Sequence, residues 1–152
     1  MNIDFYAASV IILTPQLIYL SYIDLLHYKI HNKSILILFL SFLILSPFYL
    51  NIQEIAYRSI FSFAIFFILL LPFSRGLIGG GDVKLLAVIF LWIGVEKALD
   101  FYLYLSFFTI FFIFISIIGI IPKLKNNNKT YIPFGPAVSC AAILNFLLHY
   151  SN

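Results

Sequence analysis

Long runs of apolar residues, separated by short polar segments, dominate the chain. A helix needs about 20 predominantly apolar residues to cross the hydrocarbon core of a bilayer. Runs that reach or approach this length lie at residues 5–23, 35–50, 55–73, 83–95, 98–121 and 132–150, the fourth being clearly the shortest. Lipid offers no hydrogen-bond partner to an open strand edge, and the runs do not alternate as barrel strands do. Each run therefore predicts a helix.

The composition excludes a soluble protein. Of the 152 residues, 63% are hydrophobic and 10% are charged, whereas soluble domains have about 25% charged residues. A small soluble domain exposes too much surface to accommodate this composition, and disorder requires the opposite balance. The sequence predicts one all-α integral membrane domain over residues 1–152, a bundle of about six transmembrane helices. Because no removable signal peptide is recognisable at the start, the first run is expected to remain as a span.

The basic residues predict an orientation. Seven of the nine Lys and Arg residues lie on the side of the first, third and fifth connections between runs, and two lie on the other side. Since basic residues in short loops stay in the cytoplasm, the first side is expected to be cytoplasmic and both termini non-cytoplasmic. Trp92 and Tyr57 fall near outer ends of runs, where interfacial aromatic residues are typical. His149, near the end of the chain, is expected to be solvated.

Two acids at membrane depth carry the candidate chemistry. Asp24 closes the first run, and Asp82 opens the fourth after Gly79, Gly80 and Gly81, on the same expected side. Ionisable residues in membrane segments indicate functional sites by default. Two adjacent carboxyl groups cannot both ionise. One can therefore activate a water while the other donates a proton to a scissile carbonyl, as in aspartyl proteolysis. Such a pair titrates as a unit, so acid and base are not assigned.

The residues alone leave other interpretations open. Asp82 is also placed to cap a helix N-terminus, and Asp24 could pair with Lys29 at the interface. Lys84 could hold Asp82 or attract acidic parts of a substrate, or act only as a topology anchor. The glycine run could let a peptide substrate approach closely. The two acids could instead bind cations or protons in a small transporter or channel subunit. Two features argue against a transporter: both acids stand at the ends of runs, and the chain has no internal repeat.

No metal, cofactor or nucleic-acid partner is expected. The chain has one cysteine, which excludes a Cys-rich zinc module. His27 and His31 lie beside Asp24, but no further Cys, His or acid cluster accompanies them to complete a metal site.

Three segments resemble the prepilin peptidases, or type IV leader peptidases, which are Gly-x-Gly-Asp intramembrane aspartyl proteases. Residues 76–84, Gly-Leu-Ile-Gly-Gly-Gly-Asp-Val-Lys, are similar to their signature. Asp24 followed by Lys-Ile-His-Asn at 29–32 resembles their first-aspartate motif, with His31 where the family usually has proline. Residues 131–137, Tyr-Ile-Pro-Phe-Gly-Pro-Ala, resemble the segment that opens their last span.

The resemblance implies a function and a site. Asp24 and Asp82 would be the catalytic aspartates, and Pro133, Gly135 and Pro136 would shape a loop that lines the site. The enzyme would sit in the inner (cytoplasmic) membrane and remove the short basic leader of prepilin-like or pseudopilin proteins at the cytoplasmic face. Its partners would be that substrate, with its hydrophobic helix, and membrane lipid. The large members' N-terminal domain, with Cys-x-x-Cys pairs and methylating activity, has no counterpart here, so the chain resembles the short peptidase-only form of tight-adherence pilus systems.

Overall fold

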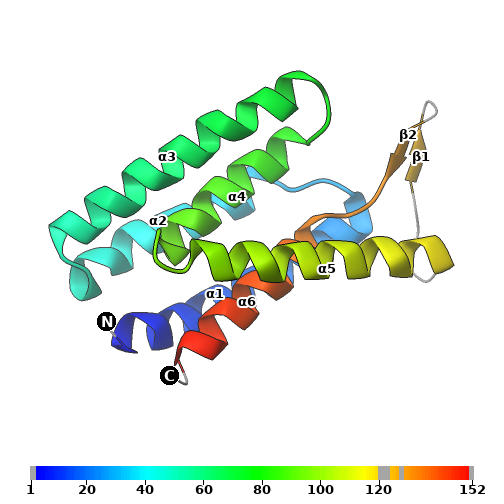
Figure 1. The fold of residues 1–152 in the computed structure, drawn as a ribbon. Coiled ribbons are helices and arrows are strands. Elements are labelled where there is room, and N and C mark those ends of the chain that lie inside the picture. Colours follow the sequence, from blue (N-terminus) through cyan, green and yellow to red (C-terminus); the bar gives the residue numbers. More distant parts are fainter. Residues whose placement is uncertain (1–2, 120–123, 127–128, 151–152) are drawn as a thin grey trace.

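The computed structural model describes residues 3–119, 124–126 and 129–150, and these form six helices and one small hairpin (Figure 1). The helices are α1 Ile3–His27, α2 Asn32–Tyr49, α3 Ile52–Ser74, α4 Gly80–Ile93, α5 Ala98–Ile118 and α6 Gly135–Tyr150. The hairpin pairs β1, Leu124–Asn126, with β2, Lys129–Tyr131, in antiparallel register. The predicted all-α fold with a short fourth helix is confirmed; the hairpin was not predicted.

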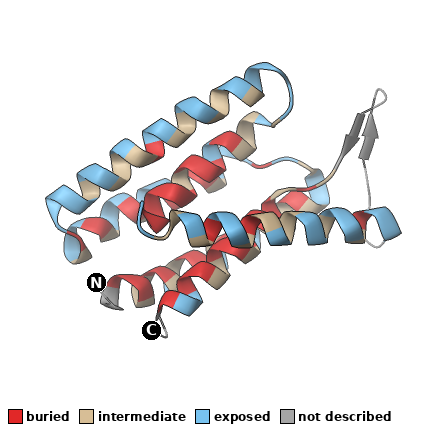
Figure 2. Cartoon of the chain, viewed as in Figure 1, coloured by how far each residue is buried: buried red, intermediate tan, exposed pale blue. Residues whose placement is uncertain are grey.

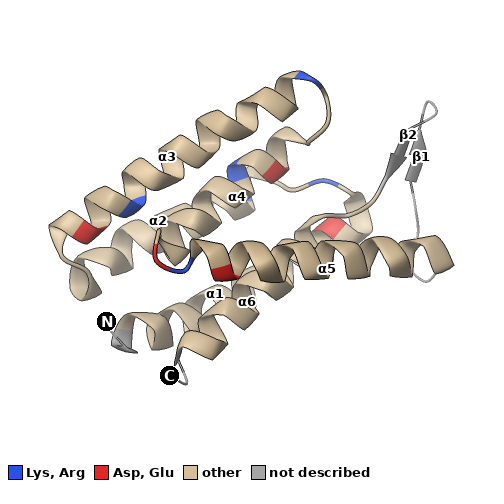
Figure 3. Ribbon diagram, viewed as in Figure 1, with Lys and Arg blue, Asp and Glu red and all other residues tan. Residues whose placement is uncertain are grey.

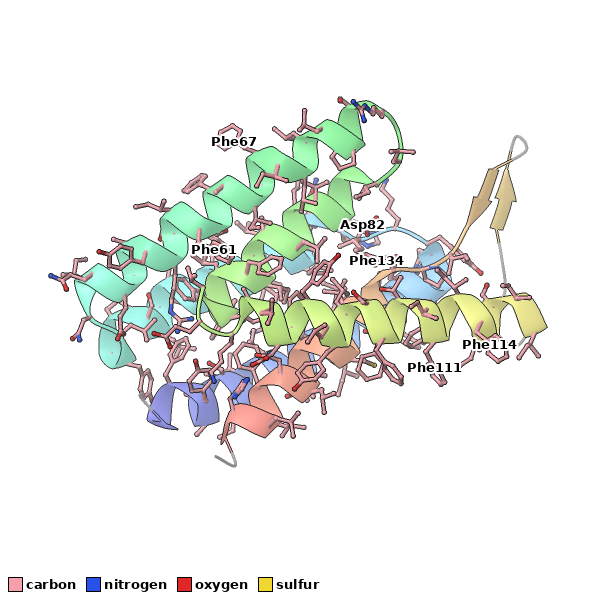
Figure 4. The ribbon with its side chains drawn as sticks, viewed as in Figure 1. Phe61, Phe67, Asp82, Phe111, Phe114 and Phe134 are labelled. Carbon is pink, nitrogen blue, oxygen red and sulfur yellow. The ribbon has the colours of Figure 1, made fainter. Side chains whose placement is uncertain are left out.

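The membrane character of the fold is also confirmed. Helices α1, α2, α3 and α5 are long and apolar enough to cross a membrane, and α6 is a shorter apolar helix. The outward faces of α3 and α5 carry exposed phenylalanines, among them Phe67, Phe111 and Phe114 (Figure 4). A continuous apolar surface of this extent suits lipid and not water. The phenylalanine-rich α5 is therefore lipid-facing bulk over much of its length.

Helix α4 occupies the centre of the bundle. It packs against α3 and α2, and more lightly against α6 and α5, while α1 lies along α6 (Figure 1). Burial is concentrated on α4 and on the facing sides of α1 and α6 (Figure 2). A helix that is hydrophobic all round belongs in a core, and Leu85, Ile89 and Trp92 of α4 are fully buried. Because neighbours surround it, α4 need not be long enough to cross the bilayer.

The connections divide the bundle into two ends. The α1–α2 and α3–α4 connections (residues 28–31 and 75–79) gather with the β1–β2 hairpin at what we call the hairpin end (Figure 1). The start of α1, the end of α6 and the connections 50–51 and 94–97 lie at the opposite end, which we call the terminal end. This arrangement brings the segments that carry the predicted motifs to one place.

Two side chains lie differently from expectation. Trp92 is not an interfacial residue: it is buried, its Nε1–H donates to the Leu38 carbonyl at 3.1 Å, and its ring packs against Phe42. The cause is that α4 ends inside the bundle. His149 is likewise buried rather than solvated, with Nε2 3.2 Å from a carboxylate oxygen of Asp100. Tyr57 is exposed.

Arg58 of α3 holds the far end of α4. Its Nη1–H donates to the Trp92 carbonyl at 2.5 Å, and its guanidinium lies 5.1 Å from the Phe5 ring centroid. A basic group is favourable at a helix C-terminus, and the aromatic face adds a cation–π attraction. Helix α4 ends here, and Gly94 follows it with a φ of 77°. A Cβ added to Gly94 would come within 2.8 Å of Arg58 Cζ. Glycine therefore makes room for the guanidinium.

We expect Arg58→Leu to lower the free energy of unfolding by about 1–3 kcal/mol, because the carbonyl at the end of α4 loses its charged donor. The measurement is denaturant unfolding of the detergent-solubilised protein. Arg75→Leu is the matched control, since Arg75 is exposed at the end of α3. Equal losses in the two variants would contradict a specific role for Arg58.

Candidate active site

A cleft of about 1120 Å³, lined by both polar and apolar residues, opens at the hairpin end. Its walls come from the end of α1 and residues 28–32, from residues 76–81, from the start of α4, and from residues 132–134. Asp24 and Asp82 both line it, and Figure 4 shows Asp82 and Phe134 at this end of the bundle. The structure thus brings together the two aspartates that the sequence places far apart.

Asp24 faces the start of α6. It is 3% exposed, and its Oδ2 accepts a hydrogen bond from the Gly135 N–H at 2.7 Å. Phe134 supplies a second backbone donor. The N-terminus of a helix has unpaired N–H groups and a positive dipole end, so it favours a carboxylate there. The suggested pairing with Lys29 does not occur: the ion pair that the described residues form joins Asp100 and His149.

Asp82 lies in the first turn of α4, outside the four long membrane spans. The N-cap is Gly79 and Asp82 is the third residue after it, so the expectation that Asp82 itself is the cap is wrong by three positions. Its carboxylate instead accepts a hydrogen bond from the Gly79 N–H, as in a capping box.

The surroundings of Asp82 alter its protonation. Burial raises the pKa of the Asp82 carboxyl to about 6, repulsion from Asp24 acts in the same direction, and the Gly79 N–H opposes both. A carboxyl group with such a pKa can hold or release a proton near neutral pH, which general acid–base chemistry requires.

Glycines allow close approach around both carboxyl groups. An added Cβ would lie 2.9 Å from Asp24 Oδ2 at Gly135, and 2.9 Å from Asp82 Oδ2 at Gly79. At Gly81 it would lie 3.1 Å from the Cβ of Ile30, in the connection after α1. Gly80 and Gly81 form the first turn of α4 and are half-buried, whereas Gly79 is exposed. Within the glycine run, Gly79 therefore has the most accessible surface for a peptide.

Of the other predicted residues, Lys84 and Pro133 line the cleft, whereas Gly135 and Pro136 belong to the first turn of α6, outside its lining. Lys84 is exposed, and its Nζ–H donates to the Asn32 side-chain oxygen at 3.1 Å, which links the starts of α4 and α2. Pro133 is buried in the segment that lines the cleft, and Pro136 is buried in the first turn of α6, where proline is well accommodated. Lys84 thus has a bridging partner other than Asp82.

His31 fits a position where the resembled family has proline. Its φ of −77° lies within the range that the proline ring imposes, and it directly precedes α2 as the N-cap. At position 31 the backbone therefore has a φ that proline would also adopt.

Some residues that line the cleft were not predicted from the sequence. Tyr28, Asn32 and Phe134 line it without having been proposed as site residues. Asn32 and Phe134 lie inside the motifs that resemble the family, and this could have indicated them as site residues. No sequence feature indicated Tyr28. In the described part of the chain, no group of three or more His, Cys, Asp or Glu side chains could hold a metal. What the cleft offers is two carboxyl groups in one lining, that of Asp24 buried and that of Asp82 half-buried.

Comparison with known proteins gives one match. A model of the Type IV leader peptidase family matches residues 11–121, a stretch that includes both aspartates. No curated protein and no solved structure matches the chain.

Gly135→Ala is expected to lower the free energy of unfolding by about 1–3 kcal/mol, because the new methyl group overlaps the Asp24 carboxylate. Alanine normally favours a helix over glycine, so a loss identifies the clash. Gly80→Ala is the control, since its Cβ would meet only the movable Phe73 ring, at 3.2 Å. Denaturant unfolding in detergent measures both, and a stabilised Gly135→Ala protein would refute the close approach.

Asp82 is expected to make stability depend on pH. Its pKa is higher in the folded protein than the ordinary 3.8, so its contribution is complete below about pH 4 and is lost as pH rises through about 6. Asp82→Asn should remove roughly 2 kcal/mol of this decline between pH 4 and 7. Unfolding measured across that range tests it, with Glu54→Gln, an exposed acid of α3, as control. An unchanged decline in Asp82→Asn would show that other groups cause it.

Proposed function

The chain belongs to the type IV leader peptidase family and is therefore a multi-pass membrane peptidase, and on this premise we propose that Asp24 and Asp82 are its catalytic dyad. The observation that carries the proposal is their meeting in one cleft. The whole chain has six acidic residues. Two of them come from distant helices to the same cavity, where their carboxyl groups interact.

The dyad would work as a coupled acid and base. With one proton shared between the carboxyl groups, the ionised member removes a proton from a water as that water attacks the scissile carbonyl. The protonated member donates its proton to the carbonyl oxygen, which gives a neutral tetrahedral intermediate. When the C–N bond breaks, the proton taken from water goes to the departing amine, and one hydroxyl of the intermediate returns its proton to the dyad as the new carboxyl group forms. The dyad ends with one proton, as it began.

The distribution of charge supports a cytoplasmic active site. Lys29, Arg75 and Lys84 lie at the hairpin end, whereas Arg58 and Lys97 lie at the terminal end (Figure 3). We place the hairpin end in the cytoplasm and both termini outside it, in the inner membrane. A substrate whose hydrophobic helix stays in the bilayer can then present its leader to a cleft at the end of the bundle.

The proposed substrate is a prepilin or pseudopilin with a short basic leader before a hydrophobic helix. The family's name supports leader removal, and the cleft's position at one end of the bundle supports cleavage beside the membrane. A peptidase family also favours this function over the alternative of a transporter or channel subunit, which would use the two acids to bind cations or protons.

The test is cleavage of candidate prepilins by the full-length protein in liposomes, with leader loss followed by mass spectrometry. Asp24→Asn and Asp82→Asn keep the shape of each side chain but cannot exchange its proton, so each should reduce cleavage at least about 100-fold. Asp100→Asn, at the terminal end, is the matched control and should cleave. Thermal unfolding confirms that each variant is folded. Cleavage by a folded Asp24→Asn or Asp82→Asn protein would refute the assigned dyad.

A further inference from the structure

One residue of the cleft has a backbone conformation that its side chain disfavours. Tyr28, directly after α1, has a φ of 53°, and in the described part of the chain it is the one non-glycine residue with positive φ. The Cβ of an L-residue crowds the backbone there, so glycine and, less often, asparagine or aspartate occupy this region. The other described residues with positive φ are glycines.

Ending the helix does not require tyrosine. The Tyr28 N–H donates to the Asp24 carbonyl at 2.8 Å, so Tyr28 is the left-handed residue that closes the last turn of α1. Glycine is the usual residue for that purpose, and α5 ends in this way at Gly119, with φ 90°. Glycine at position 28 would end α1 with less strain. The end of the helix therefore does not explain why a tyrosine occupies this strained position.

Tyr28 is one of the residues that line the cleft. Tyr28 lines the same cavity as Asp24 and Asp82 and is half-buried, whereas its neighbours His27 and Lys29 are exposed. Its peptide N–H is bonded to the carbonyl of Asp24, which places it at a fixed position relative to the dyad. An aromatic ring with two side-chain torsions provides a large contact surface at a small entropic cost.

A role as an interfacial anchor does not explain the strain. Tyr22, on the same helix, is 60% exposed and has ordinary helical backbone. An aromatic residue that only needs to reach the membrane interface can therefore occupy α1 without a left-handed conformation. The position of Tyr28 differs because it faces the cavity.

We propose that Tyr28 is a substrate-positioning residue, whose ring packs against the peptide that crosses the cleft beside the scissile bond. This inference rests on the proposed function and adds to it a residue that contacts the substrate without exchanging protons. Because the contact holds the peptide and does not take part in bond breaking, its loss should appear in KM and leave kcat nearly unchanged.

The kinetic test compares variants of Tyr28 in liposomes containing the full-length protein. Tyr28→Gly should raise KM about tenfold, the loss expected for one aromatic contact, while its thermal unfolding midpoint equals or exceeds that of the wild type. Tyr28→Phe, which keeps the ring, should retain most of the affinity. A variant that is more stable yet binds substrate less tightly is not explained by a structural role alone.

Two further variants make the test decisive. Tyr28→Asn tolerates the left-handed conformation and replaces Tyr28→Gly if that protein does not fold. Tyr22→Ala removes an exposed ring from the same helix and should leave KM unchanged. Wild-type KM in a folded Tyr28→Gly or Tyr28→Asn protein would overturn the proposal, as would a KM in Tyr28→Phe raised as much as in Tyr28→Gly.

Photo-crosslinking separates this proposal from the proposed catalysis. With a photoreactive benzoylphenylalanine in place of Tyr28, in the Asp82→Asn background, a labelled prepilin should crosslink; the same group in place of Tyr22 should not. Crosslinking at position 28 without any cleavage by the wild type would support the contact and refute the proposed reaction. Cleavage by the wild type with no crosslink at position 28 would refute the contact.

Discussion

The hydrogen bond from the Gly135 N–H to the Asp24 carboxylate, 2.7 Å long, is the interaction on which the cleft depends. It satisfies two demands at once. The first N–H groups of α6 lack partners within their helix, and the buried carboxylate of Asp24 needs donors to offset its desolvation. Because this bond fixes where α6 begins relative to α1, it also sets the course of residues 132–134 along the cleft. This hydrogen bond therefore satisfies a donor at the start of α6, holds the carboxylate of Asp24 in place and positions residues 132–134 along the cleft.

Helix α4 provides the second half of the site, and both of its ends are capped. Asp82 accepts from Gly79 at the start, and Arg58 donates to the Trp92 carbonyl at the end. Each partner has the charge that complements its end of the helix dipole. Between the two ends the helix is apolar and packed on several sides. Such a helix cannot slide easily along its axis, so the depth of Asp82 in the bundle is held from the opposite end.

Much of this architecture could be predicted from local sequence signals. Apolar runs located the helices, the length of the fourth run identified α4 as short, and the acids flanked by glycine or by basic residues pointed to Asp24 and Asp82. What failed depended on tertiary packing. Trp92 stands near the end of a run and resembles an interfacial residue, yet α1 and α2 cover it. A tyrosine in the sequence does not indicate a left-handed backbone, so the positive φ of Tyr28 could not be predicted before the structure was known. The steric need for glycine at 135 likewise arises from a residue more than a hundred positions away.

His31 shows how a motif can change without changing the site. Its φ of −77° is a value that proline would also adopt, so the backbone at this position suits either residue, although only histidine can make the ring contact with His27. The two residues differ in the unfolded chain, because histidine explores far more backbone conformations than proline and must give them up on folding. The substitution therefore acts on the entropy of the unfolded ensemble. This chain keeps a φ that suits proline at position 31, while its fold loses a small thermodynamic advantage that proline would confer.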